Sequence, residues 1–127
     1  MIKNRTRVLI AALVLIGLVI TTTMVRSARA RFNATSWRAS PATGPGSSRI
    51  RQRMAADVVR RFLSEGMSRD SVLSLLGPAD NTVYFREAGL VYYLGPERNL
   101  ISGVDSEWLV IYLTSDNRVV RAEVTTD

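Results

Sequence analysis

The sequence predicts an α+β domain that follows an N-terminal transmembrane helix. Three observations predict this fold class. Residues 8–25 carry no charge, residues 50–76 repeat apolar side chains at helical spacing, and residues 82–125 form short apolar runs between turn residues. The expected order is a transmembrane helix, a linker, and then two helices packed on one face of a three- or four-stranded antiparallel meander.

The uncharged stretch from Val8 to Val25 is long enough to cross a bilayer as a helix. Its eighteen residues would rise about 27 Å, close to the ~30 Å hydrocarbon core. Residues 1–7 form a short basic N-terminus. We therefore expect a signal anchor over residues 8–25 and a single-pass protein of the inner (cytoplasmic) membrane, with an extracytoplasmic, periplasmic domain. The alternative is a secreted or periplasmic product, because Ala28-Arg29-Ala30 fits a signal cleavage pattern ending at Ala30.

Residues 26–48 are expected to be a basic, flexible linker. Small residues, Gly and Pro dominate it, and its two large apolar residues bury too little surface to offset the entropy of ordering the chain. Beside a membrane, its arginines would contact anionic lipid head groups and its tryptophan would lie at the bilayer interface. The predicted membrane-surface residues are Arg26, Arg29, Arg31 and Trp37.

The composition narrows the chemistry open to the chain. Histidine and cysteine are absent, which removes imidazole bases, thiol nucleophiles, disulfides and the usual zinc ligands. The net charge is +6, but residues 62–127 hold ten acidic residues against five arginines. A folded part with that balance is not a nucleic-acid surface. We predict no enzyme activity, no catalytic residue, no cofactor, no metal site, and neither nucleic acid nor a small-molecule substrate as a partner.

Residues 49–127 are expected to form the folded domain, beginning with two helices. Apolar residues at helical spacing predict the first helix over residues 49–63, and Gly66 is suited to the left-handed turn after it. Ser68 is expected to cap the second helix rather than to act as a nucleophile, because the chain offers no base to activate it. Gly77-Pro78 ends that helix.

Four short strands are predicted after the helices. They are expected over residues 82–85, 90–94, 108–114 and 119–125, with Asn117 taking a positive φ in the last turn. The strand over 108–114 is apolar on both faces, so it should be central. Its outer face and the long loop after the second strand are the expected contact surface for a partner. The predicted partner-binding residues are Tyr92, Trp108, Tyr112, Glu97 and Arg98.

Part of the domain resembles the SmpA/OmlA, or BamE-like, family. The resemblance lies in residues 65–80, which read EGMSRDSVLSLLGPAD, in Val91-Tyr92-Tyr93, and in the last hairpin over residues 109–120. It implies an ααβ-meander fold and a cell-envelope location. The best-known relatives are outer-membrane lipoproteins that support the assembly of β-barrel proteins by contacting partner proteins and anionic lipid. This chain lacks their lipobox cysteine, and Val91 stands where a tryptophan is usual.

The function expected from these features is that of a membrane-anchored, extracytoplasmic protein-interaction module in cell-envelope or outer-membrane-protein assembly or maintenance. Its partners would be other envelope or membrane proteins, with anionic lipid head groups near the linker. Two alternatives stay open at this point. One is a regulatory or sensory domain of a membrane complex, and the other is a secreted, inhibitor-like binding protein released by signal cleavage.

Overall fold

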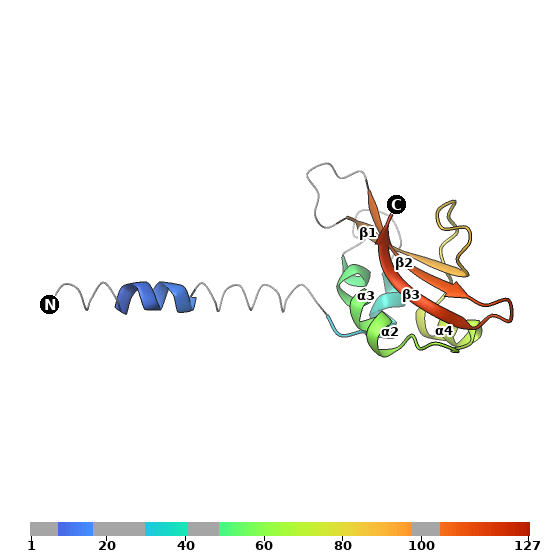
Figure 1. Ribbon diagram of the computed structural model, residues 1–127, viewed down its shortest axis with the longest axis horizontal. Helices are drawn as coiled ribbons and strands as arrows, with labels where there is room; N and C mark the ends of the chain where they lie inside the picture. Colours follow the sequence, from blue (N-terminus) through green and yellow to red (C-terminus); the bar gives the residue numbers. More distant parts are fainter. Residues whose placement is uncertain (1–7, 17–29, 41–48, 98–104) are drawn as a thin grey trace. The chain divides into compact units, whose positions relative to one another are not determined.

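The computed structural model describes residues 8–16, 30–40, 49–97 and 105–127. The chain divides into two compact units, residues 1–30 and residues 31–127. The second unit is α+β (Figure 1), and its elements in chain order are α2 (Ala34–Ala39), α3 (Ile50–Arg61), α4 (Arg69–Leu76), β1 (Leu90–Pro96), β2 (Ser106–Leu113) and β3 (Val119–Thr126).

The predicted transmembrane element is wrong. In the first unit the structure describes a helix over residues 8–16, which at 1.5 Å per residue rises only about 14 Å. Within the described residues, every helix is too short or too polar to span a bilayer. The fold class that included a transmembrane helix, the signal anchor and the single-pass inner-membrane location are corrected accordingly. Residues 17–25 of the predicted span lie outside the described residues.

The sheet is an antiparallel meander with strand order β1-β2-β3. Strand β2 is central, as its sequence predicts, and its side chains alternate between two buried faces. Leu109 and Ile111 face the side on which α3 lies, while Trp108 and Val110 face the other side, and all four side chains are buried.

The fourth strand predicted over residues 82–85 is absent, since these residues belong to a run of turns before β1. Thr82, Val83, Tyr84 and Phe85 all have high strand propensity. Propensity for strands depends on what the side chains pack against. Here the apolar side chains cover the sheet instead of joining its ladder.

Local capping signals in the sequence are confirmed. The Ser68 side chain accepts a hydrogen bond from the Ser71 N–H at the start of α4. Gly66 has φ +83° after α3, and Asn117 takes φ +60° in the turn between β2 and β3. These positions have local reasons for their residue types, which is why short-range sequence patterns identify them.

The predicted flexible linker over residues 26–48 contains a folded segment. Residues 34–39 form α2, whose first turn is capped when the Asn33 side chain accepts a hydrogen bond from the Ser36 N–H. Trp37 is 0% exposed, so it is a core residue and not the interfacial tryptophan expected from the sequence. Its ring packs edge-on against Tyr92, with ring centroids 6.2 Å apart. The physical reason is tertiary: the core of the domain supplies apolar surface that the segment itself lacks.

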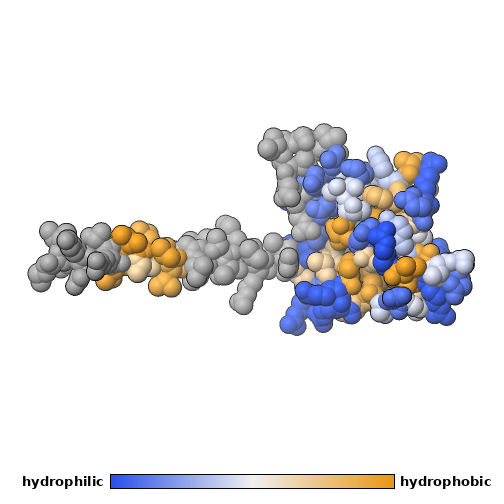
Figure 2. All heavy atoms as spheres, in the orientation of Figure 1, coloured by the Kyte–Doolittle hydropathy of each residue, from blue (hydrophilic) through white to orange (hydrophobic). Residues whose placement is uncertain are grey.

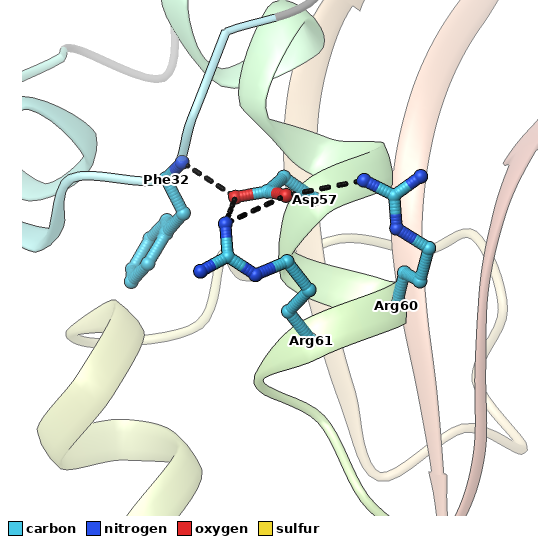
Figure 3. Close-up of polar contacts among 4 residues, drawn as sticks. All are labelled: Phe32, Asp57, Arg60 and Arg61. Atoms are coloured by element: carbon cyan, nitrogen blue, oxygen red, sulfur yellow. Dashed lines mark hydrogen bonds and ion pairs between the residues drawn. The ribbon is translucent and has the colours of Figure 1, made fainter.

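Asp57 ties this N-terminal segment to α3 (Figure 3). Its carboxylate accepts a hydrogen bond of 2.9 Å from the Phe32 N–H and pairs with Arg60 and Arg61 at 3.4 and 3.3 Å. The hydrogen bond from Phe32, followed by the charge of Arg61, lowers the pKa of Asp57. The Phe32 ring meanwhile packs on Phe62 with ring centroids 4.9 Å apart. The domain therefore begins at Arg31, ahead of α3.

Replacing Trp37 tests whether α2 belongs to the core. We expect Trp37→Ala to lower the free energy of unfolding by about 3–5 kcal/mol, because it leaves a large cavity beside Tyr92. Thr35→Ala, at an exposed position of the same helix, is the matched control and should change stability by less than about 0.5 kcal/mol. Urea unfolding measures both. Equal stability of the two variants would contradict the core role of Trp37.

Acid should weaken the link through Asp57. Because the folded-state pKa lies below the unfolded-state value, the interaction stabilises the fold at pH values above the unfolded-state pKa. That stability is lost as the pH falls through the folded-state pKa. In denaturant titrations from about pH 6 to about pH 3, Asp57→Asn should lose less stability than the unaltered chain. Glu65→Gln, at an exposed position, should behave like the unaltered chain, and a parallel loss in all three would refute the prediction.

Candidate interaction surface

The face of the sheet away from α3 carries an aromatic cluster. Val91, Trp108 and Val110 form its buried base, and four further side chains pack on that base: Phe85, Ala88, Tyr93 and Tyr112. The strand register explains the grouping, because Val91 lies opposite Val110 and Tyr93 lies opposite Trp108. Side chains that oppose one another across two strands share a face and touch.

Tyr84 and Phe85 lie over Trp108 and cover it. Their ring centroids lie 5.7 and 6.4 Å from that of Trp108, and Tyr93 approaches the same ring edge-on at 5.0 Å. These separations fall in the range that aromatic pairs prefer. Trp108 keeps only 8% of its surface exposed. We call Tyr84 and Phe85 the aromatic cover.

The backbone beneath the aromatic cover is constrained. Phe85 has φ +53°, a left-handed conformation that is rare for a bulky residue and costs on the order of 1–3 kcal/mol. The Ala88 N–H donates a 2.9 Å hydrogen bond to the Phe85 carbonyl and closes the turn. This turn leaves Val83 and Tyr84 with 67% and 48% of their surfaces exposed. The exposed residues Val83 and Tyr84 therefore lie directly before a turn that a hydrogen bond closes.

The β3 side of the same face ends in a charged pair. The Arg121 guanidinium lies 3.7 Å above the centre of the Tyr112 ring, where the electron-rich face of the ring attracts a cation. Its other partner is Glu123, at 2.6 Å, and this hydrogen bond raises the pKa of Arg121. Tyr112, a predicted contact residue, is therefore partly covered by arginine.

Tyr92 is not on this surface, contrary to the sequence-based prediction. It is 0% exposed, and its hydroxyl donates a 2.9 Å hydrogen bond to the Gly77 carbonyl. Burial raises its pKa to about 12. Tyr92 opposes Leu109 in the register, while Tyr93 opposes Trp108. Neighbouring strand residues point to opposite faces, so choosing the wrong tyrosine of the pair placed the prediction on the wrong face.

The other predicted site residues are dispersed. Glu97 is half-buried, and its N–H donates a 3.0 Å hydrogen bond to the Asp105 carbonyl, so its backbone extends the pairing of β1 with β2. Arg31 is exposed at the start of the domain. Arg26, Arg29 and Arg98 lie outside the described residues. Of the predicted membrane-surface residues, Trp37 is therefore a core residue. Of the predicted partner-binding residues, Trp108 and Tyr112 share one face of the sheet.

The aromatic cover itself was missed by sequence reasoning. Val83 and Tyr84 read as strand residues, and their exposure follows from the turn that the chain makes at Phe85. The signal available in the sequence was the short apolar run over residues 82–85. The three-stranded sheet has no position for it as a fourth strand. Figure 2 shows that other apolar residues also reach the surface of this unit among hydrophilic ones. Exposure alone therefore marks no site; exposure combined with anchoring on Trp108 does.

The described residues contain no group of three or more acidic side chains placed to hold a metal ion, and the Ser68 hydroxyl is engaged at the start of α4 with Ser71. Comparisons of the chain with family models, with curated proteins and with solved structures found no match. The resemblance to the SmpA/OmlA family therefore stays a prediction. The exposed pair Val83 and Tyr84, with the Tyr84 ring packed on Trp108, is the candidate site that the geometry supports best.

Stability measurements should separate the cover from its base. We expect Trp108→Ala to lower the free energy of unfolding by about 3–5 kcal/mol, since a buried ring leaves a cavity. Tyr84→Ala removes a half-exposed ring and should cost less than about 1 kcal/mol. Thermal and urea unfolding of the two variants provide the comparison. A loss of similar size in both would show that Tyr84 is a structural residue.

Proposed function

We propose that the domain is a protein-interaction module whose contact surface is built around Tyr84 and Val83. The observation that carries this proposal is a half-exposed tyrosine held against a buried tryptophan by a turn of unusual backbone conformation. The module acts by binding, with no catalytic step. Its partner is another protein.

Two physical arguments support Tyr84 as a contact residue. Aromatic side chains are enriched in protein interfaces, because they bury much area with few rotatable bonds. A ring already packed on Trp108 has lost much of its freedom before binding, so the partner meets a smaller entropic cost. Arg86 and Glu87 follow directly in the turn and are exposed, which gives the apolar pair a polar rim of the kind that interfaces have.

The biological process in this proposal comes from the SmpA/OmlA resemblance. It assigns the module to assembly or maintenance of the cell envelope, with envelope proteins as partners. The helix motif over residues 65–78 supports that assignment through its residues alone. The identity of the proteins captured through Val83 and Tyr84 tests it separately from the binding surface.

Site-specific photocrosslinking tests the surface. A benzophenone amino acid is placed at Val83, and at Ser74, an exposed position of α4, as the matched control. In cells that make the chain, irradiation should yield a discrete crosslinked protein from position 83 and none from position 74. Crosslinks of the same pattern from both positions, or from neither, would refute the proposed surface.

Substitution of Tyr84 should weaken capture of that protein. Truncation of an anchored interface aromatic costs about 2 kcal/mol or more, so we expect Tyr84→Ala to raise the dissociation constant roughly thirtyfold. Tyr84→Phe keeps the ring and should stay within about threefold of the unaltered chain. Titration of the purified partner against each variant measures the constants. Unchanged affinity of Tyr84→Ala would remove Tyr84 from the interface.

A further inference from the structure

A pocket opens beside the candidate interaction surface. Its volume is about 260 Å³, and its wall includes Tyr84, the half-exposed ring that packs on Trp108. The rest of the wall comes from the start of α4, from the chain between α4 and β1, and from the first residues of β1. Pockets for small-molecule ligands usually hold about 300–1,000 Å³. The size of this pocket therefore suits a single side chain of a partner.

Three charged side chains line the pocket, namely Arg69, Asp80 and Arg86. The negative one is already engaged within the fold. The Asp80 carboxylate accepts a 2.7 Å hydrogen bond from the Tyr93 N–H, and it lies 3.6 Å from the Arg51 guanidinium. Because the Arg51 side chain is largely buried next to it, the charge of Asp80 is offset from inside the domain. Asp80 therefore leaves the charge of the two arginines in the wall unmatched.

The two arginines of the pocket have no acidic partner of their own. Among the residues that the structure describes, neither guanidinium makes a hydrogen bond or an ion pair. Arg69 is partly buried at the start of α4, and Arg86 is exposed in the turn before β1. Glu87 follows Arg86 along the chain but does not line the pocket. The pocket therefore presents two positive charges beside an aromatic ring.

We propose that this pocket receives the carboxylate of an aspartate or glutamate from the partner protein. The inference rests on the proposed function, because the same partner segment places an apolar side chain against Val83 and Tyr84. A planar guanidinium matches a carboxylate, to which it donates two parallel hydrogen bonds. Tyr84 belongs to the same wall, so the occupant carries apolar surface as well as charge. A protein segment provides both, whereas a free anion provides only the charge.

A random-peptide library displayed on phage tests the chemistry of the occupant without knowledge of the partner. The library is panned on the full chain and counter-selected on Tyr84→Ala, a variant that keeps both arginines of the pocket. Peptides that survive therefore depend on the candidate surface and are not selected for charge. We expect them to share an aspartate or glutamate next to an apolar residue.

Titration of a selected peptide then identifies the residues that hold its carboxylate. Arg69→Gln and Arg86→Gln should each raise the dissociation constant about tenfold, the effect of losing one charge-assisted hydrogen bond. Arg53→Gln is the matched control, because it removes the same charge at an exposed position of α3 outside the pocket wall. Its dissociation constant should stay within about twofold of that of the unaltered chain. Circular dichroism confirms that each variant keeps the fold.

A second form of the peptide separates direct contact from general attraction to a basic chain. In this form the acidic residue is replaced by its amide. If the carboxylate contacts the pocket, the amide peptide binds the unaltered chain about tenfold more weakly, and Arg86→Gln no longer changes its affinity. General attraction would instead weaken binding of the acidic peptide to the same extent in Arg53→Gln, Arg69→Gln and Arg86→Gln.

Two results would overturn this inference while leaving the proposed surface in place. One is a set of selected peptides that depend on Tyr84 but share no acidic residue. The other is an acidic peptide whose affinity falls equally in the control and in the two pocket variants. A library that yields no peptide dependent on Tyr84 would instead remove the proposed surface, and this inference with it.

Discussion

The structure depends on covering a central strand that is apolar on both faces. Strand β2 buries Leu109 and Ile111 on one side and Trp108 and Val110 on the other. Burying apolar area is the main favourable term in folding, so a strand of this kind is stable only between two layers. The helices supply one layer. On the other side the turn that carries Tyr84 and Phe85 supplies the second, and its outermost residues form the candidate interaction surface.

The helical layer is larger than its two long helices. Trp37 of α2 fills space next to Tyr92, and the Arg51 side chain donates a 3.1 Å hydrogen bond to the Trp37 carbonyl while its guanidinium lies near the Trp37 ring. The Arg38 side chain donates a 2.9 Å hydrogen bond to the Ser74 carbonyl of α4. A segment with little apolar content therefore folds because one large side chain enters a core that the rest of the chain has built.

The two outer strands of the sheet are bonded differently to the rest of the domain. Arg51 connects α2 to the edge of β1, because its side chain bonds to the Trp37 carbonyl and its guanidinium pairs with Asp80. Asp80 in turn occupies the edge of β1. Among the described residues, turn and loop hydrogen bonds join β3 to residues 66–69 around Val119.

The sequence by itself determined the elements that local chemistry specifies: α3 and α4 by their apolar spacing, the cap at Ser68, the left-handed Gly66 and Asn117, and the central position of β2. Helical and strand periodicity are properties of neighbouring residues, so a single chain displays them. Only the tertiary structure decided that Trp37 is a core residue, that Tyr93 and not Tyr92 shares a face with Trp108, and that residues 82–85 cover the sheet rather than join it. Each of these depends on contacts between segments far apart in sequence, where one residue of register or one distant apolar surface changes the outcome.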